Sequence, residues 1–130
     1  MSRALQDTAG HRVMFAMNNE GEEDVGLWGR NIANSWTVSK GIQNPSGSTW
    51  SNIRRNLDAT SDFLNYTGPG GWSDPGSLEV GNGVLTKEQE FTHFALWCMA
   101  KAPLFISADL SNIPQDSLDI LTNTHLIHLN

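Results

Sequence analysis

Short apolar runs alternate with amphipathic segments along this chain. The runs have the length of strands and are bounded by glycine or polar residues, a pattern typical of strands that are buried on both faces. The pattern predicts strands at residues 12–17, 34–38 and 103–107, and a very short strand at Trp72.

The segments between these runs have helical spacing and predict helices at residues 2–8, 22–32, 50–64, 86–101 and 114–121. The strongest begins at Thr86, where Gln89 three residues later completes a capping box. Its second half is apolar nearly all round, so we expect it to be well buried. Residues 126–130 form a last apolar stub. Strands that alternate with helices indicate parallel βαβ units and an α/β fold, with no linker between domains.

The length and charge of the chain narrow its function. Its 130 residues suffice for one domain with a core. Eight Lys and Arg against 14 Asp and Glu give a net charge of −6, which argues against nucleic acid and anionic membranes as partners. No apolar run approaches the length of a membrane span, and residues 1–10 lack the apolar core of a signal peptide. A small neutral carbohydrate fits this charge, and so does the absence of any partner.

The sequence contains little evidence of a site for a metal ion or a cofactor. Cys98 is the only cysteine and lies in an apolar run, so we expect a buried thiol without a disulfide. His125 and His128 have helical spacing but no evident third ligand, so we expect no metal and no cofactor. The acids of residues 20–24 are interpreted as a solvated helix start, and His93 as a packed or capping residue.

In parallel α/β folds, functional sites form at the carboxyl ends of the strands. The corresponding segments here are residues 18–21, 36–41, 72–78 and 107–110. Hydrolysis of a glycosidic bond requires two carboxyl groups at such a site. The stretch from Asn34 to Asn56 contains no Asp, Glu or His, so the loop after the second strand has no proton donor.

Three segments resemble one family. Residues 67–83 read T-G-P-G-G-W-S-D-P-G-S-L-E-V-G-N-G, which resembles the G-P-G-G-W-N-D-P-D-M-L-E-V-G-N-G signature of glycoside hydrolase family 27. Residues 29–36 and 93–104 resemble the family's W-G-x-x-x-x-N-S-W-R-T and H-F-x-x-W-x-x-x-K-A-P-L motifs, in the same register. The resemblance implies an α-galactosidase or α-N-acetylgalactosaminidase relative. Its catalytic domain would be a (β/α)8 barrel followed by a β-sandwich, hydrolysing α-galactosides with retention.

The register implies which part of the barrel is present. The resemblance starts at the helix before the fifth barrel strand and ends after the eighth barrel helix. We therefore expect residues 1–130 to be the second half of a (β/α)8 TIM barrel, roughly strands 5 to 8 with their helices, arranged in parallel. The family's nucleophilic Asp belongs to the fourth strand, outside this half. The family is mostly secreted or lysosomal, but this segment does not indicate a compartment.

The resemblance also assigns site positions, and several of them are substituted. Gly41 stands where the family has its acid/base Asp, and Thr37 replaces a sugar-binding Arg. Asn19 occupies a position that often carries a sugar-binding Glu, while Gly76 and Ser77 replace the pocket-lining Asp and Met. No catalytic residue is retained, because glycine cannot transfer a proton.

The remaining pocket candidates have two interpretations each. Trp36 and Trp72 could stack on a sugar, although core packing is the favoured interpretation for both. Asp74 aligns with a non-catalytic Asp, and we expect Asp74 and Asp109 to hold turns in their own loops. The substrate-pocket candidates are Asn19, Trp36, Thr37, Ser73, Asp74, Gly76 and Ser77.

Three hypotheses follow for the function. The chain is part of an α-galactosidase-like hydrolase, a non-catalytic relative that binds galactosides or serves as structure, or a truncated remnant without function. We expect no hydrolytic activity from it. Half a barrel leaves two open sheet edges, so we also expect poor solubility, self-association through those edges, or dependence on a partner half.

Overall fold

The computed structural model describes residues 13–42 and 49–130, together with Asp7. Its centre is a parallel three-stranded sheet in which the strands follow chain order. The strands are β1 (Ala16–Met17), β2 (Ser35–Thr37) and β3 (Trp72–Asp74). Trp36 pairs with Met17 on one side and with Ser73 on the other. The helix predicted at residues 2–8 lies outside the described part of the chain, apart from Asp7.

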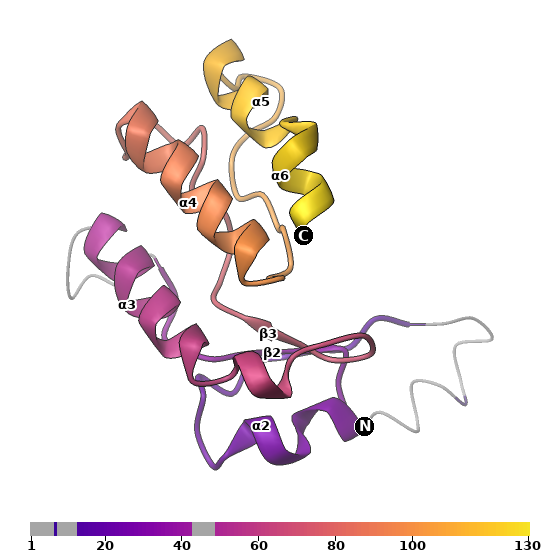
Figure 1. The fold of residues 1–130 in the computed structure, drawn as a ribbon. Helices are drawn as coiled ribbons and strands as arrows, with labels where there is room; N and C mark the ends of the chain where they lie inside the picture. The colour runs from indigo at the N-terminus through magenta and orange to yellow at the C-terminus, as the bar shows by residue number, and fades with distance from the viewer. Residues whose placement is uncertain (1–6, 8–12, 43–48) are drawn as a thin grey trace.

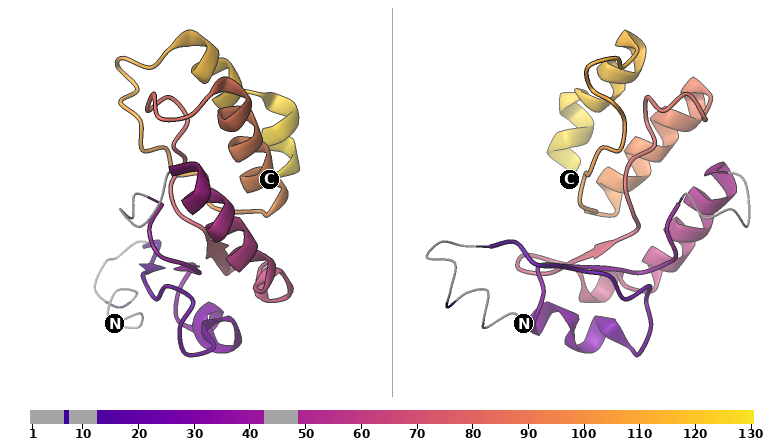
Figure 2. Two further views of the ribbon diagram at one scale, coloured as in Figure 1. Left: turned by 90° about the vertical axis from the view of Figure 1, so that its left-hand side faces the viewer. Right: turned by 180° about the vertical axis from the view of Figure 1, so that it is seen from behind.

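Helices cover one side of the strands. They follow one another around the sheet in chain order (Figure 1). The view from behind in Figure 2 shows the same order of helices. The α-helices are α2 (Val25–Trp28), α3 (Thr49–Ser61), α4 (Lys87–Met99), α5 (Gln115–Leu121) and α6 (Thr124–Leu129), and the 3-10 helices are η1 (Gly29–Asn31) and η2 (Leu64–Tyr66). This parallel, helix-covered arrangement is the expected α/β class. Within the described ranges, no helix is long and apolar enough to cross a membrane.

The predicted helix at residues 22–32 is wrong in its extent. The α-helix begins only at Val25, and η1 replaces its second half. Glu23 and Asp24 have φ angles of 53° and 52°, which lie in the left-handed region. Residues in that conformation cannot belong to a right-handed helix, so the acidic segment forms a turn instead.

The predicted fourth strand at residues 103–107 is also wrong. Only one isolated parallel bridge forms there, between Leu78 and Ile106. The Leu78 amide donates to the Phe105 carbonyl at 2.7 Å, and the Ser107 amide donates to the Leu78 carbonyl at 3.2 Å. Pro103 has no amide hydrogen to extend this pairing. The segment thus lies where a fourth strand would pair, without a regular ladder.

The end of the chain is more regular than predicted. Residues 126–129 of the predicted stub belong instead to α6, whose N-cap is Asn123 and whose C-cap is Asn130. The Asn123 side chain accepts from the amides of His125 and Leu126 at 3.1 and 3.2 Å. This cap precedes the apolar residues, so a stretch that lacked a visible start in sequence forms a helix of its own.

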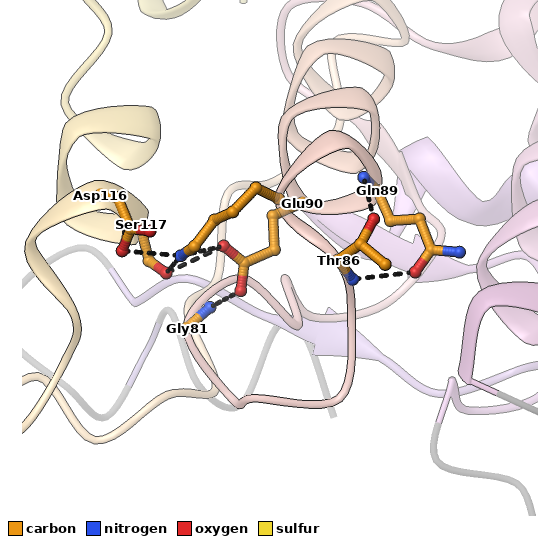
Figure 3. A network of polar contacts seen from close by, with 7 residues as sticks. Gly81, Thr86, Gln89, Glu90, Asp116 and Ser117 are labelled. Atoms are coloured by element: carbon orange, nitrogen blue, oxygen red, sulfur yellow. Dashed lines mark hydrogen bonds and ion pairs between the residues drawn. The ribbon is translucent and has the colours of Figure 1, made fainter.

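Helix α4 confirms its predicted cap and burial. The Thr86 hydroxyl accepts from the Gln89 amide at 3.3 Å, and the Thr86 amide donates to the Gln89 side chain at 3.0 Å (Figure 3). Phe94, Trp97 and Cys98 are buried on this helix. Cys98 is a free thiol, as expected, and burial raises its pKa.

The core consists of two clusters of buried apolar residues. The larger one joins α3, α4 and α5 and contains Ile53, Leu78 and Trp97 among others. The smaller one joins α2 to the sheet and consists of Val25, Trp36 and Val38, with partly buried neighbours. The smaller cluster therefore packs α2 against β2 through Trp36, while the larger one packs α3, α4 and α5 against one another and against residues that follow the strands.

A buried carboxylate connects α4 to the start of α5 (Figure 3). Glu90 is only 2% exposed. One of its oxygens accepts from the Gly81 amide at 2.9 Å, and the other accepts from Lys87 Nζ at 3.0 Å and from Ser117 Oγ at 2.8 Å. Lys87 also pairs with Asp116 at 2.8 Å. Every buried oxygen of Glu90 thus has partners, as a buried charge requires.

Replacing Glu90 with Gln is expected to lower the free energy of unfolding by about 2 kcal/mol, because a neutral amide weakens charge-assisted bonds to three groups. Urea unfolding at one fixed protein concentration measures the change. Glu88→Gln, an exposed change in the same helical turn, is the matched control and should have a much smaller effect. Equal losses in the two variants would contradict a structural role for the Glu90 network.

Candidate functional site

The carboxyl ends of the three strands lie side by side. Thr37 at the end of β2 is in register with Asp74 at the end of β3. The Thr37 hydroxyl also donates to Asn18 Oδ1, just beyond β1, at 2.8 Å. Strand alternation places Thr37 and Asp74 on the face opposite to Trp36. Three of the four predicted strand-end segments therefore meet at one edge of the sheet.

Thr37 holds the turn that follows β1. Besides donating to Asn18, its hydroxyl accepts from the amides of Asn19 and Glu20, both at 2.9 Å. The Gly21 amide donates to the Thr37 carbonyl at 3.0 Å. A hydroxyl has one hydrogen to donate and two lone pairs, so this side chain is fully used by the turn after β1.

Asp74 holds a turn, as expected from its motif. Its side chain is mostly buried, and Oδ1 accepts from the Gly76 amide at 2.8 Å. Burial raises the pKa of Asp74, while the Gly76 amide acts in the opposite direction. The carboxylate is therefore committed to local structure, and its environment disfavours the charged form.

Gly76 has a backbone conformation that favours glycine. Its φ angle is 107°, and an added Cβ would lie 3.3 Å from two Ile42 side-chain atoms. Its carbonyl accepts from Trp97 Nε1 at 2.8 Å. Glycine suits this position because a side chain would meet both backbone strain and the core.

The other pocket candidates are divided between the two faces of the sheet. Ser73 is fully buried and bonds to Thr67 Oγ1 at 2.8 Å, away from the face that carries Asp74. Trp72 is half-buried and Ser77 is exposed. These positions bring Trp72, but not Ser73, onto the Asp74 face by strand alternation.

Trp36 and Asn19 each contain a buried polar atom without a hydrogen-bond partner. Trp36 is fully buried. Its ring packs so closely on Gly29 that a Cβ added to this glycine would lie 3.1 Å from two ring atoms, which agrees with the packing interpretation. Its Nε1 lacks a partner, as does Asn19 Oδ1. Asn19 lies just beyond β1 and is half-buried as a residue, but its Oδ1 is itself a buried acceptor.

Gly41 lies in an exposed loop with open space around it. A Cβ added there would meet no atom within 4 Å, so a side chain could begin at this position without displacing a neighbour. The carbonyls on either side are both anchored: Lys40 O accepts from Asn56 Nδ2 and Ile42 O from Asn52 Nδ2, each at 2.9 Å. The backbone at the position of the missing acid is therefore held from both sides by α3.

This α3 clamp, consisting of Asn52, Arg55 and Asn56, was not predicted. Asn56 Nδ2 also donates to the Pro75 carbonyl at 2.8 Å, which connects the loops after β2 and β3. Arg55 donates to Oδ1 of Asn52 at 2.9 Å and of Asn56 at 3.2 Å, and so orients both amides. The available signal was the i,i+4 spacing of two asparagines on the apolar face of the helix.

The remaining titratable candidates have structural partners or are exposed. Asp109 Oδ1 accepts from the Ser111 amide at 3.0 Å and its hydroxyl at 2.7 Å, which lowers the Asp109 pKa. His93 is fully buried and accepts from the Glu79 amide at 3.1 Å. His125 and His128 are exposed on α6. Across the residues that the structure places, no group of three or more His, Cys, Asp or Glu could hold a metal ion.

Comparison with known proteins identifies the fold and the family. With a TM-score of 0.88 and 31% identity, α-galactosidase from Saccharomyces cerevisiae superimposes on 99% of this chain, which covers 32% of the yeast protein. A β-L-arabinopyranosidase from Geobacillus stearothermophilus shares the fold, with a TM-score of 0.84 and 20% identity. The match covers 98% of this chain and 32% of the arabinopyranosidase chain. The small parallel sheet with its helices is thus compatible with part of a TIM barrel, the fold of the glycoside hydrolases that it resembles.

The amino-acid sequence narrows this class to one family. The family model described as Alpha galactosidase A (Melibiase_2) matches residues 13–130. Alpha-galactosidase 2 from Arabidopsis thaliana is 37% identical over 130 residues, which are all of this chain and 32% of the plant protein. The chain belongs to the α-galactosidase family, glycoside hydrolase family 27. It spans about a third of the length of these relatives.

Proposed function

We propose that this chain is a segment of an α-galactosidase-family barrel that does not hydrolyse glycosides by itself. The observation that carries the proposal is Gly41, which stands at the family's acid/base position. Its loop lacks any acid, although a Cβ at this position would meet no atom within 4 Å.

The chemistry of glycoside hydrolysis supports this proposal. A retaining glycosidase needs an acid to protonate the leaving oxygen and a second carboxylate as nucleophile. Asp74 is a poor substitute, because it is buried and already accepts from the Gly76 amide. Thr37 also lacks the two-pronged donor of the Arg that it replaces, and its hydroxyl is occupied.

Binding of galactosides without hydrolysis is the second candidate function. It is favoured by Asn19 Oδ1, a buried acceptor without a partner at the end of β1. Leaving such an atom unpaired costs free energy, and a sugar hydroxyl is a suitable donor for it. The half-buried ring of Trp72, on the Asp74 face of the sheet, offers a surface for stacking against a sugar ring.

The test of inactivity is hydrolysis of an aryl α-galactoside by the purified chain. We expect the rate of phenol release to equal that of a heat-denatured sample of the same preparation. Release above this control, abolished by added galactose, would overturn the proposal.

The binding candidate is tested separately by calorimetric titration with galactose and melibiose. Weak saturable heat is expected for the unmodified chain and a loss of that heat for Asn19→Ala. Asn65→Ala changes an exposed asparagine of η2 and serves as the matched control. Absence of binding in the unmodified chain would leave a structural segment or remnant and exclude the binder.

A further inference from the structure

A pocket with a volume of about 230 Å³ lies between α2 and the segment that joins α3 to η2. Residues from both sides form its walls, namely Gly21, Asp24, Gly26, Leu27, Asp62, Phe63 and Tyr66. None of the substrate-pocket candidates at the strand ends is among them. The pocket is therefore distinct from the candidate sugar site.

The aromatic walls of the pocket pack closely against α2. A Cβ added to Gly26 would lie 2.7 Å from Tyr66 Cδ2 and 3.2 Å from Phe63 Cδ1. Glycine thus allows α2 to approach both rings. Gly26 is buried, whereas Tyr66 remains 37% exposed. The rings are therefore held at the wall of the pocket and still offer an accessible aromatic surface.

The two carboxylates of the pocket lack a cationic partner. Asp24 and Asp62 are exposed, and the described lining residues include no Lys, Arg or His. Within the described residues, the ion pairs are those of Lys87 with Glu90 and Asp116. Neither aspartate takes part in them. Two negative charges beside aromatic rings attract a positive charge, because the face of an aromatic ring is itself negative.

The composition of the walls favours an organic ammonium ion over a metal ion. Calcium and magnesium ions require a shell of about six or more oxygen ligands, whereas aromatic faces bind weakly hydrated organic cations. Within the described residues, no group of three or more His, Cys, Asp or Glu is placed to hold a metal ion. The volume is below the range of about 300–1,000 Å³ of typical ligand pockets, so the ligand is small.

We propose that this pocket binds a small alkylammonium ion. The positive group lies near the carboxylates of Asp24 and Asp62, and the alkyl groups contact the rings of Phe63 and Tyr66. Such binding is independent of the proposed lack of hydrolysis and of galactoside binding, because other residues line the strand-end site.

NMR titration of the full chain with choline tests the proposal. We expect saturable shifts of amide signals in residues 21–27 and 62–66, the segments that line the pocket. The uncharged analogue of choline, in which carbon replaces the nitrogen, should cause no saturable shift. Absence of saturation with choline, or equal binding of the analogue, would overturn the proposal.

Competition experiments separate this pocket from the sugar site and from a metal site. Choline binding should persist in excess galactose and in excess calcium chloride at constant ionic strength. Displacement by galactose would place choline at the strand ends, and saturable displacement by calcium would identify a metal site. Either result would exclude the proposed pocket or its ligand class.

Two substitutions of similar shape test the carboxylates. Asp24→Asn and Asp62→Asn should each weaken choline binding about fivefold, because each removes one of two charges. Asn caps a helix as well as Asp and tolerates the left-handed conformation of residue 24, so α2 is retained. Asp58→Asn removes the same charge one turn earlier on α3, outside the pocket, and is the matched control. Equal losses in all three variants would show that only the overall charge matters.

Substitutions of Tyr66 test the aromatic wall. Tyr66→Phe keeps a ring and should bind choline like the unmodified chain. Tyr66→Leu keeps an apolar side chain without a ring and should bind about fivefold more weakly. Circular dichroism of the variants checks that their helix content is unchanged. Unchanged binding by a folded Tyr66→Leu variant would contradict the proposed contact with the ring.

Discussion

Replacing Asn56 with alanine is expected to lower the free energy of unfolding by about 3 kcal/mol. The change removes the donor for the carbonyls of Lys40 and Pro75, at 2.9 and 2.8 Å. Asn56 is almost fully buried, so these carbonyls would lose a partner where little water is available. An unsatisfied buried acceptor costs about 1–3 kcal/mol, and two are left here.

Asp58→Ala provides the matched control for Asn56→Ala. Asp58 lies on the exposed side of α3, so the substitution makes the same change in helix propensity without removing a buried donor. Urea unfolding of both variants should therefore separate the clamp from the helix itself. A loss for Asn56→Ala no larger than the loss for Asp58→Ala would show that the two carbonyls find other partners.

Asn56→Ala should also loosen the backbone around Gly41, the position of the missing acid. Because Asn52 still anchors Ile42 O, the loop would be released on the Lys40 side only. We expect faster amide hydrogen exchange in residues 38–41 than in α4, whose bonds are unaffected. Uniform acceleration in both regions would indicate global destabilisation instead.

Some features encoded by neighbouring residues could be predicted from the sequence, whereas features that depend on distant partners could not. The capping box of α4 is complete within Thr86 and Gln89, and the structure contains it. The strand expected at residues 103–107 needed a partner segment, and only Leu78 lies opposite. The left-handed turn at Glu23 and Asp24 gave no signal in the apolar pattern, so the start of α2 was misplaced.

The same difference between local and distant partners decides which residues of the candidate site could be predicted. The motifs located the strand ends and Asp74, whose bond to Gly76 lies within its own turn. The α3 clamp was missed because its asparagines bind carbonyls 10 to 19 residues away in the sequence. A polar pair on an apolar helix face indicates buried partners, but does not say which loop supplies them.

Acidification from pH 6.5 to 4 is expected to remove about 3 kcal/mol of stability through His93 alone. Burial lowers the pKa of His93 from 6.5 to about 4, and the Ser77 backbone acts in the opposite direction. Between these values the unfolded chain binds a proton that the folded chain does not, so stability falls as the pH falls. Above pH 6.5 both states are neutral and the contribution is constant.

The geometry explains why His93 stays neutral when folded. Its Nε2 accepts from the Glu79 amide at 3.1 Å, and protonation would replace this acceptor with a second donor. Its ring also meets Trp97 edge to face, with centroids 4.1 Å apart. Asp74 has the opposite effect on stability at low pH. Because its pKa is raised in the folded chain, the folded state takes up a proton before the unfolded state does, and this uptake stabilises the folded state as the pH falls.

A comparison with His93→Gln isolates this contribution, because titrations common to both proteins cancel in the difference. The substituted glutamine side chain would retain an oxygen for the Glu79 amide but could not be protonated. We expect the stability advantage of the unmodified chain over the variant to shrink by about 3 kcal/mol between pH 6.5 and 4. His125→Gln, on the exposed surface of α6, is the control. A difference that stays constant across this range would show that protonated His93 is accommodated in the folded chain.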